Sequence, residues 1–299
     1  MSILQDIHHL KQSKQALILV HNYQRPEIQE IADFLGDSLE LSRRAAQSDA
    51  RIIVFCGVRF MAETAKILSP DKKVLLPVRE AGCPMAEMIS PEELKKLKAR
   101  YPGAAVVSYV NTNADIKALS DACCTSSNAV RVINHVPARQ IIFTPDGNLA
   151  SWCQRFVDKE IIPWNGYCYV HQRISEKEVQ QAKQRMPDAL LLVHPECRPG
   201  VIDLADEVLS TNQMVEFVRQ SGKKRFLIAT EEGLISRLKR ENPGKEFYAA
   251  GTIKICRNMK LTTLEDVYLA LKHEQYPVHL SEDTIRSCQK ALQVMIACD

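Results

Sequence analysis

The sequence of 299 residues lacks any stretch near the roughly 20 apolar residues that a membrane-spanning helix needs. Residues 1–6 also lack the basic and then apolar pattern of a secretory signal. The formal net charge of +3 is too small to indicate nucleic acid as a partner. We therefore expect a cytoplasmic protein that has neither a membrane nor a nucleic acid as its partner.

A C-x-x-C pair is missing as well, although the chain has ten cysteines. Its absence removes the usual signatures of zinc ribbons, thioredoxin-like sites and locally bound ferredoxin clusters. In a reducing compartment, many cysteines more often indicate buried thiols and a metal or redox site than disulfides. Any cysteine ligands of a metal must therefore lie far apart in the sequence and meet only in the fold.

What the chain does contain is a unit of about 86 residues, the size of a small domain, that occurs three times. An offset of 173 positions aligns the first copy with the third, and an offset of 88 aligns it with the second. Three sets of residues recur at corresponding places: His21, Tyr109 and His194; Ser38, Ser126 and Thr211; and Cys83, Cys168 and Cys256. If three homologous lobes pack about a common axis, equivalent residues meet there.

Each copy opens with a short apolar run of the kind found in buried parallel strands, at residues 16–20, 105–107 and 189–193. Helical patterns alternate with further strand patterns in each copy. The sequence thus predicts an α/β fold of three homologous αβα lobes, with short parallel sheets about a pseudo-threefold axis and the active site at the centre. We expect lobes at residues 1–82, 83–167 and 168–256, with C-terminal helices in residues 257–299 packing on the first lobe.

Polar residues follow the first strand of every copy, in the segments His21-Asn22-Tyr23, Tyr109-Val110-Asn111 and His194-Pro195-Glu196. A single histidine at a strand end is more often structural than catalytic. Folding does not require polar residues at one position of three lobes, whereas a shared cavity would. These residues are therefore candidates for a common site.

A hydroxyl residue is predicted to open the second helix of each copy, at Ser38, Ser126 and Thr211. Serine and threonine are favoured N-caps, which is a purely structural role. Helix N-termini also bind anions, and three of them converging on one cavity would suit a substrate with several carboxylates or a phosphate. Both roles stay open at this point.

The three equivalent cysteines could hold zinc with water as the fourth ligand, or three irons of a 4Fe-4S cluster whose fourth iron stays open. An open iron is a Lewis acid that can bind a substrate hydroxyl and carboxylate and assist loss of water. The alternatives are a zinc-dependent lyase or hydrolase, acting on a small phosphorylated or dicarboxylate substrate with Glu196 as base, and a non-enzymatic anion-binding protein.

Along essentially its whole length, the chain resembles the quinolinate synthase family, the iron-sulfur enzymes of NAD biosynthesis. The motifs that carry the resemblance are His21-Asn22-Tyr23-Gln24, Gly36-Asp37-Ser38-Leu39, Cys83-Pro84-Met85-Ala86, Tyr109-Val110-Asn111, Thr125-Ser126-Ser127-Asn128, residues 168–171, His194-Pro195-Glu196-Cys197 and residues 256–260. The resemblance implies condensation of iminoaspartate with dihydroxyacetone phosphate to give quinolinate, phosphate and water. It also implies one 4Fe-4S cluster per chain and functional coupling to an aspartate-oxidising enzyme.

The resemblance also implies roles for individual residues. Cys83, Cys168 and Cys256 would hold the cluster. The implied substrate contacts are His21, Ser38, Tyr109, Asn111, Ser126, His194, Glu196 and Thr211. Among the catalytic residues, Glu196 is the expected general base and Tyr23 the expected proton relay, while His21 and His194 are expected to be protonated beside bound anions.

The chain departs from the family pattern at two places. Asn212 stands where relatives often have glycine, and residues 257–260 lack the two extra cysteines that some members carry after the third ligand. Redox control by a local disulfide is therefore not expected near Cys256.

Overall fold

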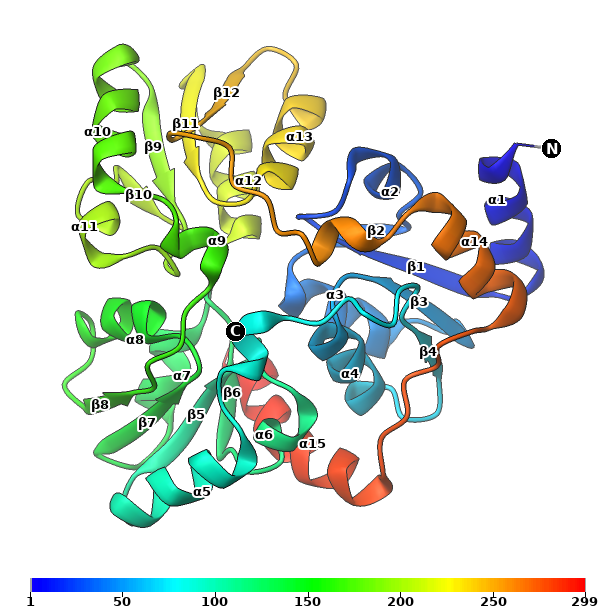
Figure 1. The fold of residues 1–299 in the computed structure, drawn as a ribbon, viewed down its shortest axis with the longest axis horizontal. Helices are drawn as coiled ribbons and strands as arrows, with labels where there is room; N and C mark the ends of the chain where they lie inside the picture. The colour runs from blue at the N-terminus through cyan, green and yellow to red at the C-terminus, as the bar shows by residue number, and fades with distance from the viewer. Residues whose placement is uncertain (1, 299) are drawn as a thin grey trace.

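The computed structural model describes residues 2–298 and contains three parallel sheets of four strands each (Figure 1). The strands are β1 (Ala16–His21), β2 (Phe34–Gly36), β3 (Ile52–Cys56) and β4 (Lys73–Leu75); β5 (Ala105–Tyr109), β6 (Ala122–Cys124), β7 (Gln140–Thr144) and β8 (Glu160–Pro163); and β9 (Leu190–Val193), β10 (Glu207–Val208), β11 (Arg225–Ala229) and β12 (Glu246–Ala249). All three sheets have the same strand order, β2-β1-β3-β4, β6-β5-β7-β8 and β10-β9-β11-β12. The predicted α/β class with three similar lobes is thereby confirmed.

Helices cover the sheets, and several begin at a capping box in which a serine or threonine and a residue three positions later satisfy each other's backbone N–H groups. The helices are α1 (Ile3–Ser13), α2 (Pro26–Glu30), α3 (Ser38–Gln47) and α4 (Arg59–Leu68); η1 (Pro84–Glu87), α5 (Pro91–Arg100), α6 (Ala114–Lys117), α7 (Ala129–His135) and α8 (Gly147–Gln154); α9 (Tyr169–Gln172), α10 (Glu176–Arg185), α11 (Pro199–Ile202), α12 (Thr211–Gln220) and α13 (Glu232–Glu241); and η2 (Met259–Leu261), α14 (Leu264–His273) and α15 (Glu282–Ala297). No helix among residues 2–298 is both long and apolar enough to cross a membrane.

Two local devices recur in all three lobes. An aspartate carboxylate accepts a hydrogen bond from a backbone N–H of the first strand, at 2.8 Å for Asp33, 2.7 Å for Asp121 and 2.7 Å for Asp206. A lysine ammonium donates to carbonyl groups at the C-terminal end of the second helix, as seen at Lys72, Lys159 and Lys245. A cation is favoured at that end because the helix dipole is negative there. The repeat in the sequence is thus also a repeat in side-chain structure.

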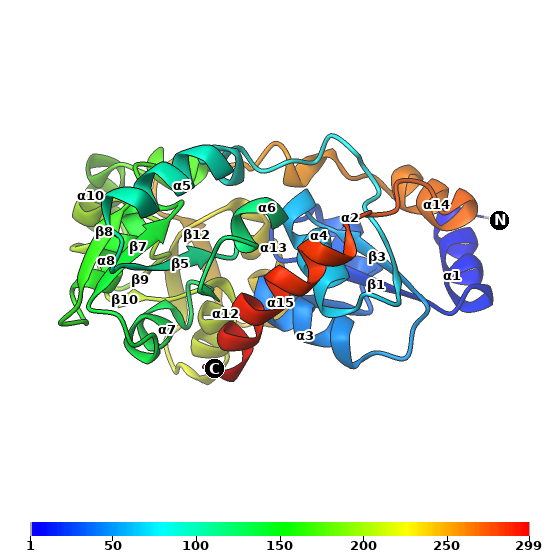
Figure 2. The ribbon, with the colours of Figure 1, turned by 90° about the horizontal axis from the view of Figure 1, so that it is seen from below.

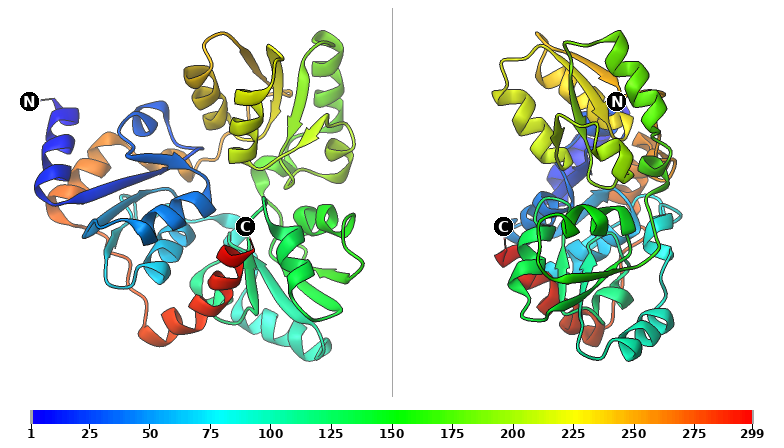
Figure 3. Two further views of the ribbon diagram at one scale, coloured as in Figure 1. Left: turned by 180° about the vertical axis from the view of Figure 1, so that it is seen from behind. Right: turned by 90° about the vertical axis from the view of Figure 1, so that its left-hand side faces the viewer.

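The three lobes lie around a common centre, and the view from behind shows each as a separate body (Figure 1; Figure 3, left). One apolar cluster runs from the first lobe into the second and includes Phe55 of β3, Phe143 of β7 and Leu292 of α15. The third lobe has its own two clusters around Leu191 and Phe226.

The two C-terminal helices pack at different places. Helix α14 lies on α1 and β3 of the first lobe, as predicted, whereas α15 runs diagonally across to the second lobe and contacts β6 and α6 as well as α4 (Figure 2). The Asn128 side chain of the second lobe donates to the carbonyl of Met295 at 2.9 Å. The prediction that both helices pack on the first lobe is therefore corrected for α15, whose apolar face is buried between two lobes.

Candidate functional site

One cavity lies where the carboxyl ends of the three sheets meet, as expected for binding sites of parallel α/β folds. Its walls include every residue that the sequence singled out: His21, Tyr23, Ser38, Cys83, Tyr109, Asn111, Ser126, Cys168, His194, Glu196, Thr211 and Cys256. Each lobe contributes a strand end and a hydroxyl residue, and one of the three cysteines follows the last strand of each sheet. The structure thus brings all twelve together, although what each does there stays a prediction.

His21 and His194 occupy the same position in the first and third lobes, at the ends of β1 and β9. Each accepts a backbone N–H at Nδ1, from Tyr23 at 3.1 Å and from Glu196 at 3.3 Å. The proton of each neutral ring therefore sits on Nε2, where it can be donated to a ligand. Burial lowers the pKa of both histidines to about 3, because the charged form loses its hydration. Burial thus favours the neutral rings, and the protonation expected beside bound anions stays a prediction.

Glu196 is the central carboxylate of the cavity, and its side chain is only 4% exposed. Its Oε2 lies 2.6 Å from Nδ1 of His171, and its Oε1 accepts from Nδ2 of Asn111 at 3.5 Å. Burial raises the pKa of this carboxyl, but His171, His194 and the hydroxyl of Tyr109 outweigh it, so the pKa lies below its usual range. Glu196 is therefore ionised at neutral pH.

A hydrogen-bonded chain connects Glu196 to Tyr23. The Tyr23 hydroxyl lies 2.6 Å from Oγ1 of Thr230, and Thr230 Oγ1 lies 2.8 Å from Nε2 of His171. Nδ1 of His171 in turn meets Glu196. Burial raises the pKa of Tyr23 well above its usual value, so its hydroxyl keeps its proton.

Sequence analysis gave no role to His171 or Thr230. Thr230 directly follows β11, a central strand of its sheet, and His171 lies three residues after Cys168. Both positions could have identified these residues as candidates, since the carboxyl ends of strands and the neighbours of metal ligands often carry functional groups.

The three hydroxyl residues do not cap their helices. The N-cap of α3 is Asp37 and that of α12 is Ser210, so Ser38 and Thr211 are the first helical residues. Ser126 precedes α7, which begins at Ala129 after Asn128. Because neighbouring residues occupy the cap positions, all three hydroxyls line the cavity instead.

Within the cavity the hydroxyls meet other polar residues. Thr211 accepts a hydrogen bond from Asn22 at 3.0 Å, and the Ser126 hydroxyl lies 3.5 Å from Nε2 of His194. Asn22, which lies between two of the predicted residues, therefore holds Thr211 in place.

The three cysteines share a local setting. Each precedes a short helical turn, and each sulfur accepts backbone N–H groups from that turn, for example those of Met85 and Ala86 at Cys83. Burial nevertheless raises the pKa of all three thiols, that of Cys83 to about 12. A metal that binds sulfur overcomes this, because coordination deprotonates the thiol outright. These residues thus fit a metal centre better than a nucleophile at neutral pH.

The spacing of the sulfurs distinguishes between kinds of metal centre. Three thiolates on one tetrahedral zinc, with bonds of about 2.3 Å, would lie about 3.8 Å apart. Among residues 2–298, the only group of three such ligand atoms within 4.8 Å of one another is Cys168, His171 and Glu196. Cys83, Cys168 and Cys256 do not form such a group, so their three sulfurs do not all lie within 4.8 Å of one another.

Fold and cavity together define a three-lobed α/β enzyme whose site is assembled by all three lobes. The family model described as "Quinolinate synthetase A protein" matches residues 5–297. The chain is 55% identical over 294 residues to a protein of Thermodesulfovibrio yellowstonii named quinolinate synthase, covering 98% of this chain and 97% of that one. It is 50% identical over 296 residues to one of Alkaliphilus metalliredigens with the same name, covering 99% and 98%. The chain therefore belongs to the quinolinate synthetase A family, as its motifs predicted.

Proposed function

We propose that this protein condenses iminoaspartate with dihydroxyacetone phosphate to give quinolinate, phosphate and water, as a step of NAD biosynthesis. The observation that carries the proposal is one cavity where three thiols, each following the last strand of one sheet, meet an ionised carboxylate linked to a protonated tyrosine. Relatives of 50% to 55% identity over nearly the whole chain carry the name quinolinate synthase. A zinc-dependent lyase or hydrolase is less well supported, because the relatives are named quinolinate synthase and the three cysteine sulfurs do not all lie within 4.8 Å of one another, as ligands of one ion would.

We infer that Cys83, Cys168 and Cys256 hold a 4Fe-4S cluster. When bound, it would supply one iron without a protein ligand as a Lewis acid for the substrate hydroxyl or carboxylate. The protein supplies the anion contacts: the Nε2–H groups of His21 and His194 and the hydroxyls of Ser38, Ser126 and Thr211 suit the carboxylates and the phosphate, and Tyr109 and Asn111 complete the set.

Proton movement is assigned to the hydrogen-bonded chain between Glu196 and Tyr23. The ionised Glu196 accepts a carbon-bound proton of the substrate as the new bond or double bond forms. His171 and Thr230 can pass a proton on to Tyr23. Tyr23 then donates its own proton to the substrate hydroxyl, which leaves as water, so that the proton balance closes within the site.

Anaerobic purification followed by iron and sulfide analysis tests the cofactor. We expect about four irons per chain, as a 4Fe-4S cluster has, and loss of the cluster when Cys83, Cys168 or Cys256 is replaced by Ala. Cys56→Ala is the matched control, since Cys56 is a fully buried thiol of the first sheet outside the cavity. Stoichiometric zinc without sulfide would refute the cluster and favour the zinc-dependent alternative.

Glu196→Gln tests the proton role. We expect turnover to fall about a hundredfold to ten-thousandfold, the usual contribution of a general base, with the iron content unchanged. Near-normal turnover in the iron-loaded variant would contradict the assignment.

The setting of the reaction is also inferred. The ten cysteines are all free, and free thiols suit a reducing compartment, which favours the cytoplasm. Because iminoaspartate hydrolyses readily, an aspartate-oxidising enzyme is the expected functional partner.

A further inference from the structure

The backbone N–H of one ligand cysteine, Cys256, is held by an acidic residue outside the cavity. Glu231, the N-cap of α13, accepts this N–H at 3.0 Å, and Asp146, the N-cap of α8, stands at the corresponding position of the second lobe. The corresponding cap in the first lobe is Val58, which has no carboxylate. The acidic caps are therefore additions to the repeat in the second and third lobes, at the positions from which a ligand cysteine can be fixed.

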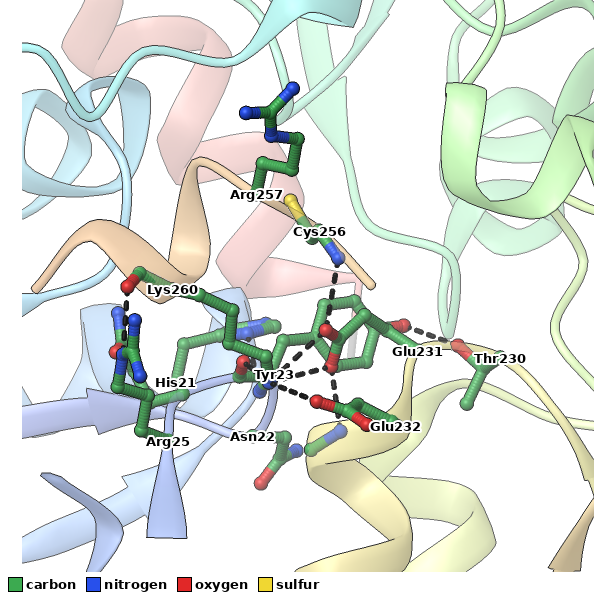
Figure 4. Close-up of polar contacts among 12 residues, drawn as sticks. His21, Asn22, Tyr23, Arg25, Thr230, Glu231, Glu232, Cys256, Arg257 and Lys260 are labelled. Atoms are coloured by element: carbon green, nitrogen blue, oxygen red, sulfur yellow. Dashed lines mark hydrogen bonds and ion pairs between the residues drawn. The ribbon is translucent and has the colours of Figure 1, made fainter. Parts of the chain in front are cut away.

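Glu231 differs from Asp146 because it is also paired with a cation. Nζ of Lys260 lies 3.1 Å from Oε1 and 3.2 Å from Oε2 of Glu231, and the two side chains are 12% and 0% exposed (Figure 4). The same ammonium donates to the backbone carbonyl of Tyr23 at 2.6 Å. One buried ion pair thus connects the loop of Cys256 with the segment of Tyr23, which belongs to another lobe.

Tyr23 is tied to the same turn at its other end. Its hydroxyl meets Thr230, the residue that precedes Glu231. Arg25 also donates to the backbone carbonyl of Lys260 at 2.8 Å. The first lobe therefore makes two hydrogen bonds with Lys260, through Tyr23 and through Arg25. Neither Glu231 nor Lys260 lines the cavity, so both act through Tyr23 and Cys256 and not on a substrate.

We propose that Glu231 and Lys260 form a clamp that fixes Tyr23 relative to Cys256, and therefore the proton-donating tyrosine relative to the metal centre. Both are positioning residues. The proposal rests on the proposed function, because it assumes that Cys256 binds metal and that Tyr23 moves a proton. A carboxylate held by a lysine and two backbone N–H groups has little freedom, which makes it suited to setting such a distance.

Glu231→Gln removes the charge while keeping the side-chain shape. We expect a chelator to remove iron about tenfold to a hundredfold faster than from the unmutated protein, the usual effect of losing a partner behind a metal ligand. We also expect kcat per bound cluster to fall about a hundredfold with KM little changed, because a displacement near 1 Å can cost that much.

Glu178→Gln is the matched control. Glu178 binds Lys254 at 3.0 Å, two residues before Cys256, and so tethers the same loop, but it has no link to Tyr23. This variant should loosen iron to some degree and leave kcat per cluster near the unmutated value. A loss of kcat as large as that of Glu231→Gln would overturn the proposal, because any loosening of the loop would then suffice.

Lys260→Met tests the contact with Tyr23 separately from the contact with Cys256. It also replaces Glu231→Gln as the test if that variant does not fold. It releases the Tyr23 carbonyl and leaves the Glu231 contact with Cys256, so kcat per cluster should fall more than iron retention does. The clamp alone would be overturned if kcat were unchanged in Glu231→Gln and Lys260→Met while the unmutated protein contained iron and formed quinolinate. An unmutated protein without iron or product would instead refute the proposed function.

Discussion

The joint between the first two lobes and the joint that holds the third are built from different interactions. An apolar cluster passes without interruption from the first lobe into the second, and α15 seals it with Leu292 and Met295, both fully buried. The third lobe has separate apolar clusters, and among residues 2–298 only Tyr23 and Trp152 of the other lobes are apolar residues that pack against them. Apolar contact is non-directional, so the first joint supplies stability without demanding one orientation.

The joint of the third lobe is made of directional hydrogen bonds around Asn22. Its Nδ2 donates to Thr211 and to Asn212, each at 3.0 Å, and its Oδ1 accepts from Arg237 at 2.5 Å. Asn212 also donates to Glu40 of the first lobe at 2.6 Å. Asn212 is therefore a contact between lobes. Since Tyr23, Thr230 and Glu196 meet across this joint, we infer that it orients the site while the apolar joint stabilises the fold.

Leu292→Ala tests the apolar joint and should have the largest effect on stability. Truncating a buried leucine costs about 2–5 kcal/mol, since apolar contact is lost and a cavity remains. Denaturant unfolding of the iron-loaded protein measures this, with Leu4→Ala as the control because Leu4 is 46% exposed. Activity of the folded variant well below its unfolding transition should stay near normal. A large loss of activity with unchanged stability would reverse the assigned roles of the two joints.

Gly233→Ala tests the polar joint. A Cβ at this position would lie 2.8 Å from the backbone of Tyr23 in the neighbouring lobe, closer than such contacts allow. Alanine has a higher helix propensity than glycine, so the substitution by itself would stabilise helix α13. We expect kcat to fall about a hundredfold as Tyr23 is displaced by roughly 1 Å.

Gly222→Ala is the control for that change, because a Cβ there has nothing within 4 Å. Steady-state kinetics of the two iron-loaded variants provide the comparison. Equal activity would mean that the close approach of α13 to Tyr23 does not position the tyrosine.

The repeat explains why so much of the site could be predicted from the sequence. Residues that recur in all three copies, such as His21 and His194, are brought together by the fold because equivalent strand ends meet at the centre. His171 and Thr230 each occur in one copy only, so the repeat gave no signal for them. The packing of α15 on the second lobe was not predicted for the same reason, since the segment after residue 256 has no counterpart in the other copies.

Two details of the site depend on properties that only packing determines: the capping residue of α3 and the charge of His21. A helix start can shift by one or two residues without changing the sequence pattern, and this moved the cap from Ser38 to Asp37. The charge of His21 depends on its complete burial, which a strand-end position does not reveal. Local pattern therefore predicts which residues gather, whereas their protonation and hydrogen-bond partners follow from the tertiary structure.

Asp203→Asn should have the smallest effect and shows which contacts of the third lobe matter. Asp203 pairs with Arg155 of the second lobe at 2.8 Å, but the two side chains are 59% and 37% exposed. Exposed pairs contribute about 0–1 kcal/mol and are screened by salt, so stability and kcat should hardly change at physiological ionic strength. The measurement is kcat and the unfolding midpoint at low and high salt. Two results together would contradict this expectation: a loss of kcat as large as that expected for Gly233→Ala, and the same loss at high salt in the unmutated protein. Surface charge, and not the buried contacts around Asn22, would then orient the third lobe.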